Sequence, residues 1–273
     1  MKGRLVVCPT PIGNLEDVTL RVLSSLRDAD IVACEDTRRT RVLLDRYGVR
    51  GKLVSYREQN ERERALELVE KMRAGEVVAL VSDAGMPLIS DPGFLLVQAC
   101  VAAGLAVEVL PGPSAVLAAL VASGLPSARW RFAGFLPRKR SELETMLATN
   151  VETLVAFESP KRTAKSLAVL ADLDPGRPVA VCRELTKLHE EVRRGRADGL
   201  AAHYAAEEPR GEVALVIGAA PPREEEAEAA VDAVRRLVAA GAKKRPAASV
   251  VSKLTGVPAN RLYRAVTEDS PGA

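Results

Sequence analysis

Val77-Val78-Ala79-Leu80-Val81-Ser82-Asp83-Ala84-Gly85-Met86-Pro87 is the stretch that decides the fold. Its first five residues form a β-rich apolar run, and a loop with a glycine and a proline follows at once. Ligands of open α/β sheets bind beyond the carboxyl ends of the strands. Glycine lets a ligand approach the backbone, and proline makes a loop rigid. The stretch therefore predicts a strand of an α/β sheet that ends in a ligand-binding loop.

The same pattern extends to both sides of this stretch. β-rich runs alternate with helical patterns, which is typical of a mostly parallel sheet in a three-layer α/β domain. Strands are expected at 5–8, 31–34, 53–56, 77–81 and 107–110. Helices are expected at 20–26, 65–72 and 95–103. We expect this first domain to cover residues 1–124.

A second and a third unit follow. Strands are expected at 131–136, 153–157, 179–182 and 212–217, with one convincing helix at 163–170, which predicts a smaller mixed α/β domain over residues 125–220. Pro221-Pro222 and the acidic run 224–228 mark the next boundary, because paired prolines break regular structure. Helical patterns at 227–240 and 247–254, a turn at 256–258 and a short helix from Asn260 resemble a helix-turn-helix over residues 221–273.

The composition excludes several classes of protein. A chain of 273 residues with 47% hydrophobic residues can bury a large core and need not be disordered. It has neither an apolar run long enough for a membrane span nor a signal peptide, so we expect a cytoplasmic location. Its 4 cysteines are far apart beside apolar neighbours, as reduced buried thiols would be. With 2 histidines and no Cys-x-x-Cys pair, no metal site is expected.

Two further loops resemble the one after residues 77–81. Pro9-Thr10-Pro11-Ile12-Gly13-Asn14-Leu15 follows the first expected strand, and Pro111-Gly112-Pro113-Ser114-Ala115 follows the fifth. Ser114 can cap the next helix and offer a hydroxyl. None of these loops is a Gly-x-Gly-x-x-Gly or Walker A sequence, so neither a dinucleotide site nor a phosphate-binding P-loop is indicated. Their occurrence at successive strand ends favours one shared ligand pocket.

Two charged strings end other expected strands. Glu35-Asp36-Thr37-Arg38 follows the second strand, and Arg183-Glu184-Leu185-Thr186-Lys187 follows the run at 179–182. Each has a structural alternative: Asp36 can cap the next helix, and the second string can form a local charge network. We expect His189 at the surface and Asp91-Pro92-Gly93 as a plain turn.

Together with Ser82-Asp83-Ala84-Gly85-Met86-Pro87-Leu88-Ile89-Ser90-Asp91-Pro92-Gly93, these motifs closely resemble one group of the tetrapyrrole methylase superfamily. That group is the bacterial 16S ribosomal RNA cytidine 2′-O-ribose methyltransferases. The resemblance covers residues 4–218, and the last module resembles the helix-turn-helix appended to many members. It implies two α/β domains, S-adenosylmethionine (SAM) in the cleft between them, and a homodimer. The tetrapyrrole and diphthine relatives lack the two charged strings in this form.

The resemblance also implies which residues contact SAM. In the first domain they are Pro11, Gly13, Asn14, Asp83, Gly85, Pro87, Ser114 and Ala115. In the second domain they are Glu158, Leu185, Glu212, Val213 and Ala214.

The chemistry of methyl transfer sets further requirements. A methyl sulfonium is already an activated electrophile, so the protein must align the nucleophile and manage one proton. A ribose 2′-hydroxyl is a very weak acid, so a base or a charge that stabilises the alkoxide should lie nearby. The catalytic candidates are Asp36, Arg38, Glu184 and Lys187, with Glu35 as a further carboxylate and Arg183 as a phosphate or oxyanion partner. The sequence does not choose one base among them.

Basic residues interleaved with aromatic ones suit an RNA substrate. Trp130, Phe132 and Phe135 lie in an acid-free stretch between Ser127 and Ser141, although they could equally form the buried face of a strand. The expected RNA contacts are Arg138, Lys139, Arg140, Lys161, Arg162 and Arg183. The last module has 8 lysines or arginines and no acid between residues 233 and 264, which favours RNA binding over a merely solvated helical face.

We therefore expect SAM-dependent methylation of a cytidine 2′-hydroxyl in 16S rRNA, with the assembled small ribosomal subunit as the expected partner. One alternative is carbon methylation of a tetrapyrrole, which the same cofactor loops would serve. The other alternative is a non-catalytic RNA-binding protein that kept the cofactor fold.

Overall fold

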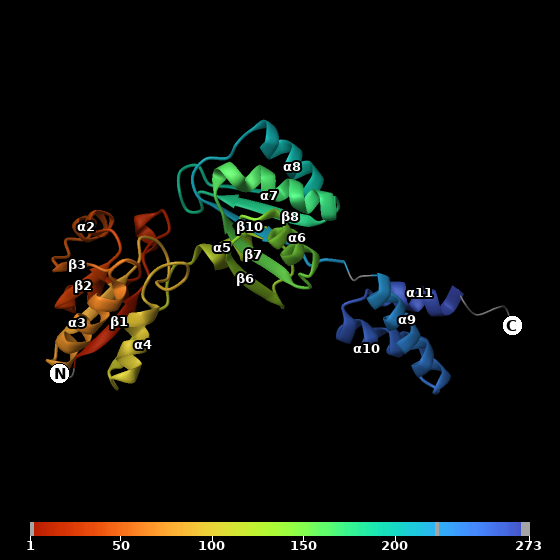
Figure 1. Ribbon diagram of the computed structural model, residues 1–273, viewed down its shortest axis with the longest axis horizontal. Coiled ribbons are helices and arrows are strands. Elements are labelled where there is room, and N and C mark those ends of the chain that lie inside the picture. Colours follow the sequence, from red (N-terminus) through yellow and green to blue (C-terminus); the bar gives the residue numbers. More distant parts are fainter. Residues whose placement is uncertain (1–2, 222–223, 269–273) are drawn as a thin grey trace.

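The computed structural model describes residues 3–221 and 224–268. Within them the chain forms two five-stranded sheets with helices, followed by a group of three helices (Figure 1). This arrangement confirms the predicted α/β fold class and the predicted helical C-terminal module. Pro222, half of the predicted proline boundary, lies outside the described residues.

All neighbouring strands of the first sheet run parallel. The strands are β1 (Arg4–Cys8), β2 (Ile31–Cys34), β3 (Leu53–Ser55), β4 (Val77–Val81) and β5 (Ala106–Val109), in the order β3-β2-β4-β1-β5. All five lie where the sequence predicts them. Because β1 and β4 are neighbours in register, with Cys8 opposite Val81, their carboxyl ends meet at one edge of the sheet. The loops after these two strands are therefore brought side by side.

Helices cover both faces of this sheet. They are η1 (Leu15–Asp17), α1 (Leu20–Asp28), α2 (Thr37–Arg46), α3 (Glu61–Arg73) and α4 (Phe94–Ala102). α1 and α2 pack on one face, and α3 and α4 on the other. α2 is not among the predicted helices, because its apolar residues form one short run, Val42-Leu43-Leu44, between charged residues. Cys8, Cys34 and Cys100 are buried free thiols in these cores, as predicted, and Cys182 is buried in the second unit.

The second sheet is mixed. Its strands are β6 (Trp130–Phe135), β7 (Thr153–Glu158), β8 (Pro178–Arg183), β9 (Glu191–Arg196) and β10 (Val213–Ile217), in the order β6-β7-β10-β8-β9. Only β6 and β7 pair in parallel, and the other pairs are antiparallel. The sequence does not predict the edge strand β9, because Glu-Val-Arg-Arg-Gly-Arg has no apolar alternation and most of it is exposed.

The prediction of a single helix in this unit is wrong. The structure has three: α6 (Arg140–Ala148), α7 (Pro160–Leu173) and α8 (Ala197–Ala206), all of which contribute to the core on one face of the sheet. α6 buries only Leu143 and Leu147, so its apolar pattern is weak. α8 is rich in alanine, which hides its periodicity.

Helix α5 (Ala115–Ser123) joins the two sheets physically. It starts from the loop after β5 but packs on the second sheet, with Val116, Ala119 and Leu120 against Val155 and Ala180. Residue 124, the predicted end of the first domain, directly follows this helix. In the sequence the helix falls within the first predicted domain, but it packs on the second sheet. The three predicted domain ranges stay predictions.

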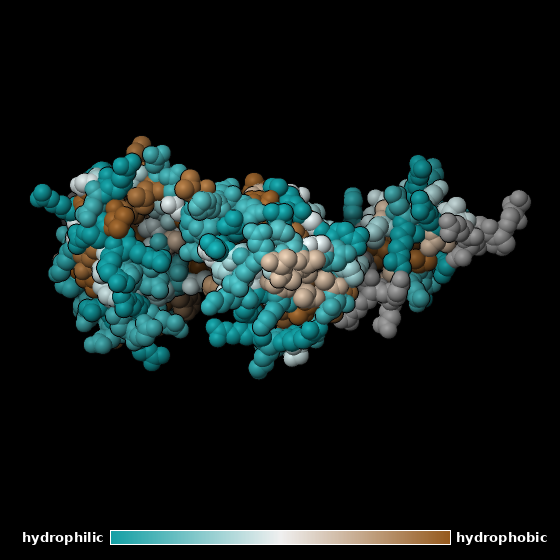
Figure 2. Space-filling view, turned by 90° about the horizontal axis from the view of Figure 1, so that it is seen from above, coloured by the Kyte–Doolittle hydropathy of each residue, from teal (hydrophilic) through white to brown (hydrophobic). Residues whose placement is uncertain are grey.

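The C-terminal module has a core of its own. Helices α9 (Glu224–Ala239), α10 (Lys244–Thr255) and α11 (Ala259–Glu268) enclose Val234, Val251, Val257 and Leu262. Gly256 ends α10 in a left-handed conformation, which glycine adopts without strain, and so sets the turn into α11. Among the described residues, no helix is long and apolar enough to cross a membrane. The face shown in Figure 2 is mostly hydrophilic, with small separate hydrophobic patches.

Candidate active site

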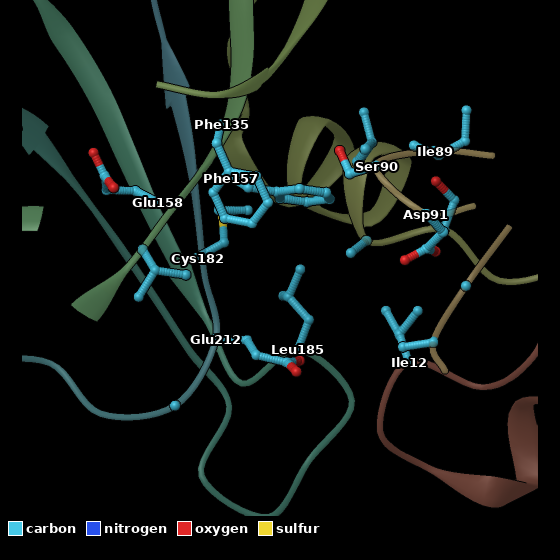
Figure 3. A pocket seen from close by; sticks show the side chains of 18 of the residues that line it. Ile12, Ile89, Ser90, Asp91, Phe135, Phe157, Glu158, Cys182, Leu185 and Glu212 are labelled. Carbon is cyan, nitrogen blue, oxygen red and sulfur yellow. The ribbon is translucent and has the colours of Figure 1, made fainter. Parts of the chain in front are cut away.

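An apolar pocket of about 360 Å³ lies between the two sheets. Its wall comes from the loops after β1, β4 and β5 on one side and from the ends of β7, β8 and β10 on the other, as Figure 3 shows for ten labelled residues. This volume and this mostly apolar lining with a few polar groups are typical of a small-molecule site. The predicted shared pocket at successive strand ends is therefore present.

Backbone pairing fixes the loops after β1 and β4 to each other. Thr10 and Gly85 exchange two backbone hydrogen bonds of 2.9 Å each. The Thr10 hydroxyl donates to the Ser82 carbonyl at 3.0 Å, and the Ser82 hydroxyl donates to the Gly85 carbonyl at 3.0 Å. Gly85 has a positive φ of 78°, where a side chain would be strained. These contacts hold the pocket wall rigid on the first-sheet side.

A second contact joins the two halves across the pocket. The Asn14 backbone N–H donates to the Thr186 hydroxyl at 3.0 Å. Gly13 is so close to the loop after β8 that a Cβ atom there would lie 2.8 Å from Thr186 Oγ1 and would also meet the Lys187 side chain. Glycine at this position lets the loops of the two halves touch, which closes one end of the pocket.

The structure places the predicted SAM contacts in two groups. The residues that line the pocket are Gly85, Ser114, Ala115, Glu158, Leu185, Glu212, Val213 and Ala214. Those that do not are Pro11, Gly13, Asn14, Asp83 and Pro87, although their neighbours Ile12, Ala84 and Met86 do. Sequence reasoning missed Ile89, Ser90, Asp91, Phe135 and Phe157. The position of Phe135 and Phe157 at strand ends beside the predicted site was the available signal for these two.

The Glu158 carboxylate points away from the pocket (Figure 3). It is buried, accepts hydrogen bonds from the Ser166 hydroxyl at 2.6 Å and its neighbour's backbone N–H at 2.8 Å, and lies 3.2 Å from the Arg162 guanidinium. Arg162 in turn donates to the carbonyls of Leu136 and Pro137. This network anchors the loop after β6. The side chains of Glu158 and Arg162 therefore stabilise this part of the structure and do not contact a ligand directly.

A second, polar cavity of about 670 Å³ adjoins the first. It is lined by Glu35, Asp36, Arg38, Arg57, Glu58, Gln59, Glu61, Asp83, Ser90, Asp91, Pro92, Gly93 and Phe94. Ser90 and Asp91 line both cavities. The structure therefore brings Asp36, Arg38 and Asp83 together in a space next to the apolar pocket.

Asp36 caps a helix, as the structural alternative predicted. Its carboxylate accepts from the Arg38 backbone N–H at 2.8 Å at the start of α2 and pairs with the Arg38 guanidinium at 2.7 Å. These hydrogen bonds from Arg38 hold the pKa of Asp36 well below its usual range. A carboxylate with so low a pKa is a poor proton acceptor near neutral pH.

Glu184 and Lys187 form a charge network, which was also a stated alternative. The Lys187 ammonium donates to Glu184 at 2.8 Å and to Glu212 at 3.0 Å. The hydrogen bond from Lys187 lowers the pKa of Glu184. Partial burial lowers the pKa of Lys187, but its hydrogen bonds to the two carboxylates outweigh burial and raise it. This network of one lysine and two glutamates supports the loop that reaches Gly13.

Asp91 lies in a different environment from these candidates. Burial and the nearby carboxylates of Glu35 and Asp83 raise the pKa of Asp91 to about 7. Burial, followed by Asp83, also raises the pKa of Glu35. Asp91 lies in a bend, as expected, and it also lines both cavities, which the expectation of a plain turn did not include. Its place in the loop after β4, on the same sheet edge as the other loops, was the signal in the sequence.

The predicted RNA contacts differ in how freely they can bind a phosphate. Arg140 pairs with Glu144 and Asp172, Lys139 pairs with Glu142, and Arg183 pairs with Glu191. Arg138 and Lys161 are exposed and have no ion-pair partner within residues 3–221 and 224–268. Lys161 directly follows the wall residue Pro160, and Arg138 lies three positions after Phe135, a wall residue that is largely exposed.

Comparisons with known proteins agree with this geometry. The tetrapyrrole (corrin/porphyrin) methylase family matches residues 4–201. The chain is 47% identical over 274 residues to ribosomal RNA small subunit methyltransferase I of Mesorhizobium japonicum, which covers 98% of this chain and 92% of the relative. The protein of that name from Thermotoga maritima is 43% identical over 217 residues, which is 79% of this chain and 98% of the relative.

Solved structures show the same fold. Uroporphyrin-III C-methyltransferase from Thermus thermophilus, complexed with S-adenosylhomocysteine, has a TM-score of 0.57 at 22% identity and covers 79% of this chain and 97% of its own. The family match and the named relatives define the class, a methyltransferase. The chain belongs to the tetrapyrrole methylase family. These findings confirm the predicted enzyme class, with SAM as methyl donor.

Proposed function

We propose that this protein transfers a methyl group from SAM to the 2′-hydroxyl of a cytidine in 16S rRNA. The observation that carries the proposal is the pair of cavities that meet at Ser90 and Asp91, one apolar and one polar. The names of the relatives supply the class of acceptor, small-subunit ribosomal RNA. The ribose and the cytidine follow from the motif resemblance given above.

The residues of the apolar pocket fit SAM. Ile12, Phe157 and Leu185 offer apolar contact for an adenine ring, while Ser114 offers a hydroxyl at the start of α5. When bound, SAM supplies an activated methyl group that needs no metal. The protein's own task is then to exclude water, hold the acceptor hydroxyl in line with that methyl group, and take up one proton.

The polar cavity fits a nucleotide. Arg38 and Arg57 can bind phosphate or ribose oxygens, and the carboxylate of Glu58 can accept a hydrogen bond from the exocyclic amine of cytosine. Its contact with the apolar pocket at Asp91 would bring a ribose in the polar cavity next to the methyl donor.

Two exposed cations beside the pocket support an RNA partner. Arg138 and Lys161 extend the site on the second-sheet side, where the Phe135 ring is 61% exposed and able to stack on a base. The C-terminal module adds the basic helices α10 and α11. Positive charge spread over so much of the surface suits a large RNA partner such as the assembled small ribosomal subunit. A protein that acts on this subunit would be located in the cytoplasm.

A homodimer is part of the same proposal. The apolar side chains of Leu117 and Val121 on α5 are 51% and 80% exposed, and that of Leu188, in the loop after β8, is 93% exposed. Apolar groups this exposed favour burial against a second copy. Light scattering on a size-exclusion column should give twice the chain mass, and Val121→Glu should shift the mass toward one chain. A monomeric wild-type protein would contradict the dimer while leaving the methyltransferase intact.

The experiment that tests the function is transfer of labelled methyl from SAM to parallel acceptors. The acceptors are small ribosomal subunits from cells that lack this gene, free 16S rRNA, and a tetrapyrrole precursor. We expect label in the subunit or its RNA and none in the tetrapyrrole. Label in the tetrapyrrole alone would overturn the acceptor and leave the fold and the methyl donor in place.

A further inference from the structure

Asp91 occupies the junction of the two cavities. With Ser90 it is one of the two residues that line both. In Figure 3 it lies on the first-sheet side of the apolar pocket, with Phe157 and Leu185 on the opposite side. A side chain in this place can act on a group in the polar cavity and on a group in the apolar pocket at once. The other carboxylates of the polar cavity, among them Glu35 and Asp36, do not line the apolar one.

The backbone holds Asp91 in this position at some cost. Leu88 and Ser90 have φ angles of 73° and 67°, in the left-handed region that residues other than glycine rarely adopt. Gly93 follows with a φ of 139°, and a Cβ atom there would lie 2.8 Å from Leu88 and 2.9 Å from Leu80. Strain of this kind persists where the surroundings determine the conformation, and it is common at functional sites. The loop therefore presents the Asp91 side chain in one orientation.

Charged groups from several neighbouring elements line the polar cavity with Asp91. The end of β2 supplies Glu35, and α2 supplies Arg38. The loop after β4 supplies Asp83. The chain after β3 supplies Arg57 and Glu61. Arg39 lies 3.6 Å from Asp83, and the Gly93 N–H donates to Glu61. Burial, then Glu35 and Asp83, raise the pKa of Asp91 to about 7, whereas the nearby Ser82 side chain lowers it. A carboxylate with this pKa can exchange a proton readily at physiological pH.

The other candidates for the base are less suited. Asp36 is bound by Arg38 and Glu184 by Lys187, and both pairings lower the pKa of the carboxylate. Lys187 is held protonated between two carboxylates. The pKa of Glu35 is raised, but Glu35 lines only the polar cavity.

We propose that Asp91 is the group that accepts the proton of the acceptor hydroxyl during methyl transfer, an inference that rests on the proposed function. In this step the oxygen–methyl bond forms, the sulfur–methyl bond breaks, and the hydroxyl proton passes to the Asp91 carboxylate. The positive charge on sulfur and the negative charge on Asp91 disappear together. In a half-buried site this matters, because a charge left without a partner is costly.

Charge pairing makes a prediction that does not depend on any acceptor. SAM carries a positive sulfonium and its product, S-adenosylhomocysteine, does not, so only SAM should favour the ionised form of Asp91. Near pH 6.5, where Asp91 is largely protonated in the free protein, SAM binding should release a proton and product binding should not. A mutual shift of about one pKa unit corresponds to about a tenfold preference for SAM over the product.

Calorimetric titration with SAM and with its product tests this directly. In two buffers of different ionisation enthalpy at pH 6.5, wild-type protein should release a fraction of a proton with SAM only. Asp91→Asn should abolish the release and leave product binding within about twofold. At about pH 8, where the wild-type carboxylate is ionised, Asp91→Asn should weaken SAM binding about tenfold. Asp45→Asn, an exposed carboxylate of α2, is the matched control and should behave as wild type. Equal proton release from wild type and Asp91→Asn would overturn the inference.

Single-turnover methylation supplies the second readout. With wild-type protein the rate should rise with pH as Asp91 ionises and then level off. Asp91→Asn should lower the rate at least about a hundredfold and remove this rise, while Asp91→Glu, which restores a carboxylate, should recover part of the rate. An Asp91→Asn rate within about threefold of wild type would refute the proton-acceptor role. Failure of the proposed function would look different, because wild type itself would then not methylate the RNA.

Discussion

Glycine 13 shows how one residue can determine the shape of a site that lies between two sheets. Its missing side chain allows the loop after β1 to contact Thr186 and Lys187 in the loop after β8. The Asn14 N–H then reaches the Thr186 hydroxyl at 3.0 Å. The two halves of the pocket are therefore held at a fixed separation by a contact that any larger residue would disturb.

Gly13→Ala should weaken SAM binding about tenfold or more, because an added methyl group in such tight packing costs about 1–3 kcal/mol and forces the loops apart. Calorimetric titration measures the effect. Gly199→Ala, at a position with nothing within 4 Å of the added Cβ, is the matched control and should bind as wild type. Unchanged affinity in Gly13→Ala would mean that this contact does not shape the pocket.

Glu158 is a residue whose role the sequence could not reveal. Side chains alternate along β7, so Phe157 faces the pocket and α5 while Glu158 faces α7 with Ala156. The apolar run predicts the strand end correctly, but the orientation of a terminal carboxylate depends on a partner, Ser166, that lies eight positions along the chain.

Glu158→Ala should lower the free energy of unfolding by about 3 kcal/mol, because it leaves the Arg162 charge and the Ser166 hydroxyl without their partner. Urea denaturation followed by circular dichroism measures this. Lys165→Ala, on the exposed side of α7, should change the stability by less than about 0.5 kcal/mol. A Glu158→Ala protein as stable as wild type would show that the buried network contributes little.

At the scale of elements, the loops after the strands are easier to predict than the helices. Parallel strands have apolar runs and end at one edge, so the sequence alone assigns the loops after β1, β4 and β5 to one pocket. α6 buries few residues and α8 is rich in alanine, so their periodicity is weak, and α2 has only one short apolar run. The sequence also does not predict which charged residues form ion pairs, because partners such as Lys187 and Glu212 are 25 positions apart.

The exposed cations near the start of α6 and α7 differ in whether they have an ion-pair partner among the described residues. Arg138→Ala or Lys161→Ala should weaken binding to 16S rRNA and reduce the slope of log affinity against log salt by about 0.7–0.9 per cation, without changing SAM affinity. Arg140→Ala is the control, since Glu144 and Asp172 already neutralise this guanidinium. Fluorescence anisotropy at several salt concentrations measures both. A larger effect from Arg140→Ala would refute this assignment of the RNA surface.

At the scale of the whole molecule, the C-terminal module is separable from the site. It has its own core, and its helices do not contribute to either cavity. The relative from Thermotoga maritima matches over 98% of its own length but only 79% of this chain, so it is shorter by an amount close to the module. We therefore expect the methyltransferase fold of this chain not to depend on these helices.

A chain that ends at Pro221 should bind SAM as the full chain does, because every residue of both cavities is retained. Its affinity for 16S rRNA should fall about tenfold or more, because the basic helices α10 and α11 are lost. Calorimetry and anisotropy on the same preparation check the two expectations. RNA affinity equal to that of the full chain would give the module another task.

The proposed function is defined by the atom that receives the methyl group, the 2′-oxygen of a cytidine. The most direct measurement is complete nuclease digestion of small-subunit RNA after reaction with labelled SAM, followed by mass spectrometry of the nucleosides. We predict that the label appears as 2′-O-methylcytidine, at one position, and only with active protein. Label on a base, or on the ribose of another nucleoside, would contradict the claim.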